Sequence, residues 1–350
     1  MTSIKSRAAV FGASVLAVIG IFAGGTAPAS AAGSVVVYCG VNEEWCRAAS
    51  AAFQQKTGIQ VNMTRQSAGE IYARLKAEKE NPRGDIWWGG TGDPHLQAAE
   101  EGLTIEYQSP RMSELNDWAV RQWKQSKQRT IGVYAGALGY SFNTELFKRK
   151  GGAEPRCWSD LTDPRYKDEV QVADPNASGT SYTMLATLVQ MMGEDKAFDY
   201  LKRLHRNINQ YTKSGAAPAN AVRTGESLIG ITFQHDAVVM AIQGGPIKIV
   251  SPCEGTGYEI GSMSIVKGAR NLDNAKKWYD WALTAEAQNL GPLGKVSFQV
   301  PSNKAAKAPP QAPDFSTIKF IDYDFAKYGS SAERTRLLSK WDKEVKNLPK

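Results

Sequence analysis

Histidine and cysteine are scarce in this sequence of 350 residues, which contains three histidines and four cysteines. Three histidines leave little material for a histidine-rich metal centre or for a catalytic triad. The G-x-S-x-G pattern of serine hydrolases, the H-E-x-x-H pattern of zinc proteases and the glycine-rich nucleotide-binding loops are all absent. We therefore expect a protein that is not an enzyme and that carries no metal or other cofactor.

A concentrated stretch of one charge is also missing. The 42 lysines and arginines exceed the 35 acidic residues by seven, and this excess is spread along the chain. A nucleic-acid-binding protein is expected to cluster its basic residues, so we expect no nucleic-acid partner. Hydrophobic residues make up 42% of the chain and charged residues 22%, which is typical of globular proteins, and the length suits about two domains.

The first 31 residues predict a secretory signal peptide. Lys5 and Arg7 precede an apolar stretch over residues 8–24, and small residues at 29–31 are typical of a cleavage site. The alternative is a membrane anchor, but the apolar stretch is short for a membrane span and no basic cluster follows it. We therefore expect a mature protein that is exported to the periplasm.

The four cysteines are expected to form two disulfides, because the exported compartment is oxidising. Three pairings are possible. The short spacing between Cys39 and Cys46 favours a bridge between these two, with Cys157 paired to Cys253. The C-x-x-C pattern does not occur, which disfavours zinc binding and redox chemistry.

Short apolar runs alternate with amphipathic stretches along the rest of the chain. The runs typical of buried parallel strands are residues 35–38, 85–88, 170–173, 228–233 and 247–250. Apolar residues recur at helical spacing between them, for example over residues 181–192 and 272–283. This alternation predicts an α/β fold in which helices cover mostly parallel sheets.

Small polar residues follow several of the predicted strands. Ser178, Gly179 and Thr180 come after one strand and open a helix, and Ser214 lies in a similar loop further along. Ligands of open α/β sheets bind beyond the carboxyl ends of the strands, and helix N-termini there attract anions. These loops therefore predict an anion site, with helix capping alone as the alternative.

Hydrogen-bond acceptors follow two other strands. His235 and Asp236 end the predicted strand 228–233, where they are placed to contact hydroxyl groups, unless they form only a structural pair. Glu254 and Glu259 lie in a loop that leads to the next strand and are acceptors for hydroxyls or amines.

The chain resembles a periplasmic solute-binding protein of an ABC importer, of the ferric-binding-protein-like branch. The resemblance covers nearly all of the chain after residue 31 and is carried by Val37-Tyr38-Cys39-Gly40, Thr57-Gly58-Ile59, Gly84-Asp85-Ile86-Trp87-Trp88, Gly225-Glu226 and Lys267-Gly268-Ala269. It implies a monomer with the type II two-lobed fold and a hinge. It also implies these divisions: 1–31 signal peptide, 32–132 first lobe, 133–256 second lobe, 257–300 return to the first lobe, and 301–350 C-terminal segment on the second lobe.

The sequence departs from this branch at the metal ligands. Iron binders of the family hold Fe(III) with two adjacent tyrosines, a histidine, a glutamate and a phosphate. Here His235 and Asp236 occupy the place of the tyrosines, and Asn42 occupies the place of the histidine. The loops that hold phosphate are retained, so the resemblance implies a phosphorylated organic ligand and points to a subgroup similar to hexose-phosphate binders.

The expected function is therefore capture of a small phosphorylated solute, such as a hexose phosphate, for delivery to a permease in the inner membrane. The residues expected to hold the phosphate are Ser178, Gly179, Thr180 and Ser214. The residues expected to hold the sugar hydroxyls are His235, Asp236, Glu259, Glu254, Asn42 and Thr91. The alternative functions are binding of Fe(III), binding of an aminophosphonate, hydrolysis by an exported phosphatase, and action as the receptor partner of a sensor.

Overall fold

The computed structural model describes residues 33–350, so the predicted signal peptide over residues 1–31 lies outside the described residues. The strands are β1 (Ser34–Cys39), β2 (Gln60–Arg65), β3 (Ile86–Trp88), β4 (Ile131–Asn143), β5 (Val170–Ala173), β6 (Ile208–Thr212), β7 (Ile229–Phe233), β8 (Ile247–Val250), β9 (Tyr258–Ile265) and β10 (Val300–Pro301).

The helices that fill the connections are α1 (Glu43–Thr57), α2 (Ala68–Ala77), α3 (Gly92–Glu100), α4 (Asp117–Gln125), α5 (Thr144–Lys150), α6 (Gly179–Met192), α7 (Glu194–His205), α8 (Ala217–Thr224), α9 (Gln234–Ile242), α10 (Leu272–Ala282), α11 (Ala285–Leu293), α12 (Phe325–Tyr328) and α13 (Ser331–Trp341). None of the helices between residues 33 and 350 is both long and apolar enough to cross a membrane.

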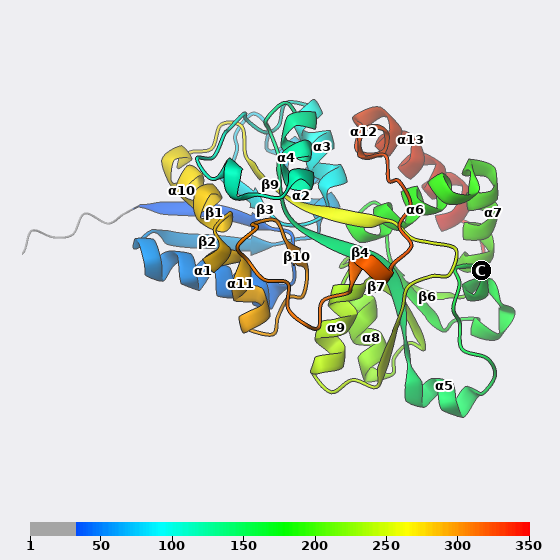
Figure 1. Ribbon diagram of the computed structural model, residues 1–350. Helices are drawn as coiled ribbons and strands as arrows, with labels where there is room; N and C mark the ends of the chain where they lie inside the picture. Colours follow the sequence, from blue (N-terminus) through cyan, green and yellow to red (C-terminus); the bar gives the residue numbers. More distant parts are fainter. Residues whose placement is uncertain (1–32) are drawn as a thin grey trace, which may run out of the picture. The chain divides into compact units, whose positions relative to one another are not determined.

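The strands form two sheets that share β4 (Figure 1). In the first sheet, β1 lies parallel to β2 and β3, and β9 joins β3 to β4 in antiparallel fashion. In the second sheet, β5 lies parallel to β6 and β7, and β7 and β8 pair antiparallel with β4. We call the first sheet with its helices the first lobe, and the second sheet with its helices the second lobe.

Strand β4 links the two lobes because its two ends pair with different partners. Residues 131–137 pair with β9, and residues 138–142 pair with β7. All thirteen residues of β4 are buried. The predicted α/β class with flanking helices is confirmed, and strands β5 and β8 have the predicted bounds. Strand β4 was not predicted, since three glycines and several small residues weaken its strand signal.

Local signals explain where α1 begins and ends. The Asn42 side chain accepts a hydrogen bond from the backbone N–H of Trp45 (2.9 Å), which caps the first turn. Glu43 and Glu44 lie in that turn, where their charge suits the positive end of the helix. Gly58 ends the helix with φ 71°, a left-handed conformation that favours glycine.

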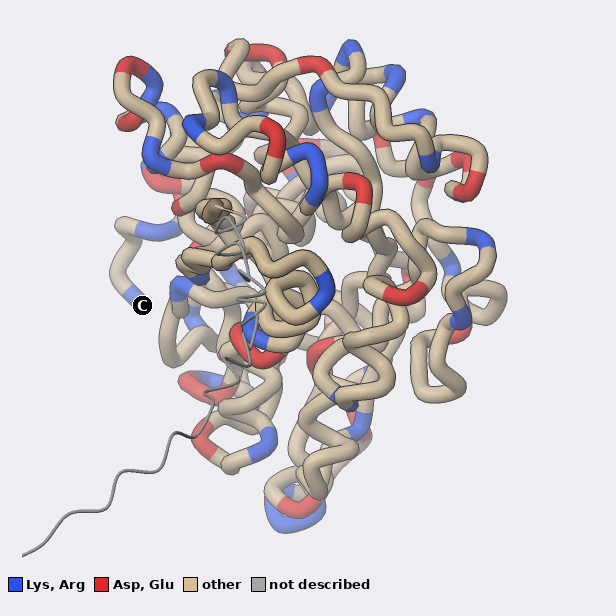
Figure 2. The backbone as a smooth tube through the Cα atoms, turned by 90° about the vertical axis from the view of Figure 1, so that its left-hand side faces the viewer, with Lys and Arg blue, Asp and Glu red and all other residues tan. Residues whose placement is uncertain are grey.

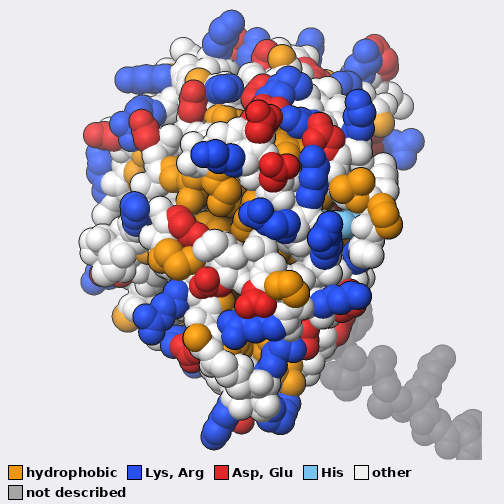
Figure 3. Space-filling model, turned by 90° about the vertical axis from the view of Figure 1, so that its right-hand side faces the viewer, with side chains coloured by type: hydrophobic (Ala, Val, Ile, Leu, Met, Phe, Trp, Pro, Cys, Tyr) orange, Lys and Arg blue, Asp and Glu red, His pale blue; other side chains and the backbone are white. Residues whose placement is uncertain are grey.

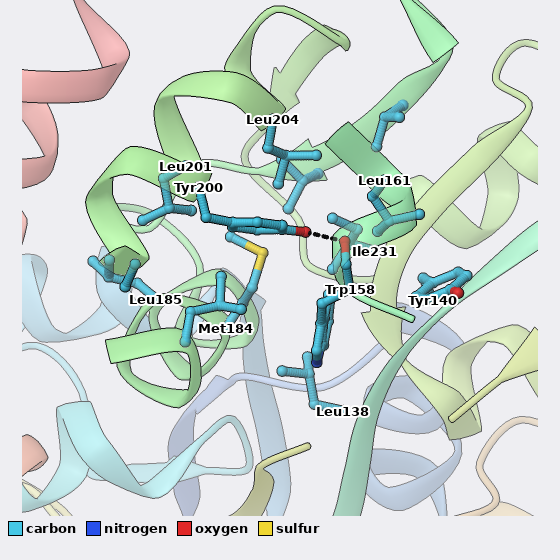
Figure 4. Packing of buried hydrophobic residues seen from close by; sticks show 14 of the residues in the cluster. Leu138, Tyr140, Trp158, Leu161, Met184, Leu185, Tyr200, Leu201, Leu204 and Ile231 are labelled. Carbon is cyan, nitrogen blue, oxygen red and sulfur yellow. Dashed lines mark hydrogen bonds between the residues drawn. The ribbon is translucent and has the colours of Figure 1, made fainter. Parts of the chain in front are cut away.

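Each lobe has its own apolar core. In the second lobe, Leu138 from β4 and Met184 from α6 pack with Trp158, and the Tyr200 hydroxyl donates a hydrogen bond to the Trp158 carbonyl (2.7 Å; Figure 4). Leu337 of α13 is part of the same buried cluster, so the C-terminal helix packs on the second lobe. The first lobe is centred on aromatic rings of α1, β3 and α10.

Charged side chains of both signs are interspersed over the surface. Lysines and arginines lie among aspartates and glutamates along the tube in Figure 2 and over the face seen in Figure 3. The face in Figure 3 therefore does not carry the single-sign patch that a nucleic acid would need.

Two disulfides form with the predicted pairing. Cys39 at the end of β1 is bonded to Cys46 in α1, seven residues further along, and ties the strand to its helix. Cys157 is bonded to Cys253, 96 residues further along, and closes a loop that contains most of the second lobe.

Replacing both members of each disulfide by serine should destabilise the protein unequally. A cross-link stabilises mainly by restricting the unfolded chain, and more so when the closed loop is longer. We expect loss of the Cys157–Cys253 bridge to cost roughly 4–5 kcal/mol and loss of the Cys39–Cys46 bridge roughly 2–3 kcal/mol. Urea unfolding of the two double variants measures this difference, and equal losses would contradict the loop-length argument.

Candidate ligand-binding site

A pocket lies between the two lobes, and its volume together with its opening to solvent is about 440 Å³. Six helices begin at its wall, three from each lobe. Their N-cap residues, all of which line the pocket, are Asn42 (α1), Ser67 (α2), Thr91 (α3), Ser178 (α6), Ala216 (α8) and Phe233 (α9). The first N–H groups of a helix have no partner inside the helix and carry partial positive charge. Six such ends make the pocket favourable for an anion.

Arg65 adds a full positive charge to this wall. It is the last residue of β2, and its guanidinium donates hydrogen bonds to the Val41 carbonyl (2.9 Å) and to the Ser214 hydroxyl (3.2 Å). Burial lowers the pKa of Arg65, whereas the nearby Asp236 carboxylate opposes that shift. Since Val41 belongs to the first lobe and Ser214 to the second, Arg65 joins the two lobes at the pocket.

Hydroxyl groups complete the part of the pocket beside α6. Ser178 and Thr180 line it from the first turn of the helix. Gly215 leaves room for both, since a Cβ atom there would lie 2.1 Å from Thr180 Oγ1 and 2.8 Å from Ser178 Oγ. The Thr91 hydroxyl lines the pocket from the other lobe and is buried without a hydrogen-bond partner among the described residues. A ligand can therefore supply the missing partner.

A second group in the pocket consists of two carboxylates and an imidazole. His235 Nε2 lies 3.7 Å from Glu259 Oε1 and 3.8 Å from Asp236 Oδ1. Burial raises the pKa of both carboxyl groups and lowers the pKa of His235. Gly136 of β4 allows this packing, because a Cβ atom there would lie 2.5 Å from the imidazole ring.

The structure brings eight of the ten predicted ligand-binding residues to this one pocket. They are Asn42, Thr91, Ser178, Gly179, Thr180, His235, Asp236 and Glu259. Ser214 lines a neighbouring pocket that shares Arg65 and Asp236 with this one, and it accepts the hydrogen bond from Arg65. The binding roles of these residues remain predictions.

Three placements differ from the expectations. Glu254 does not line the pocket, because its carboxylate accepts hydrogen bonds from the backbone N–H groups of Trp158 (2.8 Å) and Ser159 (2.9 Å). Glu259 lies on β9 rather than in a loop, and His235 and Asp236 lie in the first turn of α9 rather than on a strand.

Four residues with polar side chains in the pocket wall were not predicted from the sequence: Arg65, Ser67, Tyr134 and Gln299. Arg65 has a sequence signal, since it is the basic residue at the carboxyl end of an alternating strand. Tyr134 has none, because it belongs to the unpredicted strand β4. Its hydroxyl accepts a hydrogen bond from the N–H of Gly90 (2.9 Å), and burial raises its pKa far above the usual value.

The two lobes touch directly beside the pocket. The backbone N–H of Gly69 in α2 donates a hydrogen bond to the Ala177 carbonyl (3.0 Å), which precedes α6. A Cβ atom on Gly69 would lie 2.3 Å from the Asn176 carbonyl oxygen, and one on Gly179 would lie 1.8 Å from Thr91 Oγ1. Glycine at these two positions is therefore needed for the lobes to approach so closely.

Comparison with known proteins agrees with this architecture. Residues 91–328 match the family of bacterial extracellular solute-binding proteins. The chain is 45% identical to the periplasmic binding protein AfuA of Actinobacillus pleuropneumoniae, whose structure was determined with exogenous fructose-6-phosphate bound. That alignment covers 90% of this chain and 99% of AfuA, with a TM-score of 0.86.

Two further relatives are similar over most of their length. The periplasmic binding protein P5PA is 39% identical, with 90% of this chain and 100% of P5PA covered and a TM-score of 0.87. A putative 2-aminoethylphosphonate-binding periplasmic protein of Salmonella typhimurium is 27% identical, with 82% of this chain and 84% of that protein covered. The chain thus belongs to the bacterial extracellular solute-binding proteins, the periplasmic components with which ABC transporters capture their solutes, which is a transport family and not a class of enzymes.

Proposed function

We propose that this protein captures a small organic phosphate, a sugar phosphate such as a hexose phosphate, and delivers it to the permease of an ABC importer. The observation that carries the proposal is the polarity of the pocket. Six helix N-termini and Arg65 supply positive potential, and the Asp236 and Glu259 carboxylates lie in the same enclosed space. A ligand with an anionic group and several hydroxyl groups matches both features.

The phosphate is assigned to the wall formed by α6, α8 and Arg65. Ser178 and Thr180 offer hydroxyl groups, and the first turns of the two helices offer backbone N–H groups. Gly179 lets the backbone approach the ligand closely, since it carries no side chain. Ser214 lies at the edge of this wall, where its hydroxyl accepts a hydrogen bond from Arg65.

The hydroxyl groups of the sugar are assigned to His235, Asp236 and Glu259, with Thr91 and Asn42 on the side of the first lobe. Asn42 contributes less, because its amide already caps α1 and donates to the Val296 carbonyl (2.6 Å). The likeness to AfuA, which has been seen with fructose-6-phosphate, supports this choice of ligand.

Hinge closure is the proposed mechanism, and it rests on the proposed division of the chain into lobes. Residues 32–132 and 257–300 form one lobe, residues 133–256 form the other, and residues 301–350 accompany the second lobe. The ligand stabilises the closed form because it contacts both lobes at once. The direct contact of Gly69 with Ala177 is then made only in the closed form.

An aminophosphonate is the second candidate ligand. The Salmonella relative with that description supports it, and a buried carboxylate pair suits an amine. Iron is less favoured. The one group of potential metal ligands found among residues 33–350 is Cys157, Cys253 and Glu254, and its two cysteines are bonded to each other.

Thermal unfolding against a panel of ligands tests the proposal. The panel contains fructose 6-phosphate, glucose 6-phosphate, inorganic phosphate, 2-aminoethylphosphonate and ferric citrate. A ligand present at ~100 times its Kd stabilises a protein by about 2.7 kcal/mol, which shifts Tm by a few degrees. We expect this shift with a sugar phosphate and little shift with the other compounds. A shift with ferric citrate alone would overturn the proposal.

Replacing Asp236 by alanine should remove discrimination among sugars and leave some affinity for phosphate. Asp236 lies in the pocket beside His235 and offers a carboxylate for sugar hydroxyl groups, whereas the hydroxyl and N–H groups assigned to the phosphate belong to other residues. Isothermal titration with fructose 6-phosphate and glucose 6-phosphate measures the effect. Glu254→Gln is the matched control, because this carboxyl lies outside the pocket. Unchanged binding by Asp236→Ala would exclude the assigned role.

Replacing Gly69 by alanine should disfavour closure. The new Cβ atom would collide with the Asn176 carbonyl of the other lobe, and overpacking of this kind costs typically about 1–3 kcal/mol. We expect the affinity for fructose 6-phosphate to fall on the order of tenfold, with the Tm of the unliganded protein unchanged, since alanine is a good helix former. If Gly69→Ala instead lowered the stability of the unliganded protein by the same free energy as it lowered ligand binding, the contact between Gly69 and Ala177 would not depend on closure.

A further inference from the structure

The imidazole of His235 lies between two carboxylates that share one enclosed space. Its Nε2 atom is 3.8 Å from Asp236 and 3.7 Å from Glu259, and the three side chains are only 4%, 12% and 3% exposed, respectively. The Thr232 hydroxyl lies 3.3 Å from the Asp236 carboxylate, but it donates its proton to the Gly215 carbonyl (2.7 Å). Among the described residues, no hydrogen bond to the Glu259 carboxylate is formed.

The groups that surround this cluster do not neutralise it. Arg65 of β2 attracts Asp236, but its guanidinium forms hydrogen bonds with Val41 and Ser214 rather than with a carboxylate. Asp93 of α3 adds a third negative group near Glu259. Tyr134 of β4 is neutral. The Arg65 charge offsets part of the charge of Asp236, whereas none of the groups that shift the pKa of Glu259 is a cation, so at least one carboxylate charge is left uncompensated beside a neutral imidazole.

We propose that His235, Asp236 and Glu259 share one proton when the pocket encloses the neutral polyol end of a sugar phosphate, so that binding of the sugar phosphate takes this proton from the solvent. Two like charges in a low-dielectric site disfavour each other's ionisation, and one shared proton removes that repulsion. The inference rests on the proposed function, since it assigns the proton to the polyol end of the same pocket.

The directions of the pKa shifts agree with a proton held by the carboxyl groups of Asp236 and Glu259. Burial and the Asp236 charge raise the pKa of Glu259 well above its usual value, and burial raises that of Asp236. Burial also lowers the pKa of His235, which places the proton on the carboxyl pair. A protonated carboxyl group can donate one hydrogen bond and accept another, which matches the hydroxyl group of a sugar.

The sign of the pH dependence follows from the proton balance. Opening of the two lobes would hydrate these carboxyl groups, and hydrated carboxyl groups are ionised at pH 7. The closed complex holds one proton more, so affinity should fall as pH rises. Uptake of one proton corresponds to a Kd that increases about tenfold for each pH unit. Between pH 7.5 and 8.5, neither the phosphate group (second pKa ≈ 6) nor a free histidine (pKa ≈ 6.5) contributes much to this slope.

The experiment is isothermal titration of the mature protein with fructose 6-phosphate at pH 7.5, in HEPES and in Tris. These buffers differ in ionisation enthalpy, so the difference in heat gives the number of protons taken up. We expect a value close to one, and a Kd about tenfold weaker at pH 8.5. For Glu259→Gln, which keeps the shape and can still donate a hydrogen bond, we expect a proton uptake close to zero and a Kd that no longer changes between pH 7.5 and pH 8.5.

The outcomes separate this inference from the proposed function. Tight binding of fructose 6-phosphate without proton uptake overturns the inference and leaves the function intact. Uptake that persists in both Glu259→Gln and Asp236→Asn also overturns it, because the proton is then held elsewhere. Absence of binding by every sugar phosphate, with a folded protein, overturns the proposed function and the inference with it.

Discussion

Six helices begin at the wall of one pocket, and the rest of this structure depends on this constraint. Each helix end brings N–H groups that have no partner inside the helix, together with partial positive charge. Ends of like sign repel one another unless water or an anion lies between them. The two sheets place these ends together, because the helices follow strands whose carboxyl ends face the same gap. An anionic ligand therefore removes an electrostatic cost that the fold itself creates.

The carboxylates of Asp236 and Glu259 limit which anion fits. A simple inorganic anion that fills the whole pocket would lie close to both of them and would be repelled. An elongated ligand avoids this conflict, since its charged end can meet the helix termini while a neutral end meets the acids. Under the proposed function, a ligand with a phosphate group at one end and hydroxyl groups at the other meets both requirements.

Local signals predicted the parts of this site that depend on a single strand–loop–helix unit. Ser178, Gly179 and Thr180 lie at such a turn, and so do His235 and Asp236, although the last two begin α9. The parts that depend on strand pairing were missed. Tyr134 comes from β4, whose glycines conceal the strand. Glu254 and Glu259 could not be told apart, because only the pairing of β9 with β4 brings one of them into the pocket.

The glycines of β4 and of the facing turns have a common physical reason. Gly136 makes room for the His235 ring, Gly69 for the Asn176 carbonyl, and Gly179 for the Thr91 side chain. A side chain at any of these positions would hold the lobes apart or displace the acidic cluster. Gly136 is thus both one of the residues that weaken the strand signal of β4 and the residue that makes room for His235, so the packing of the acidic cluster and a clear strand signal make opposite demands on the same stretch of chain.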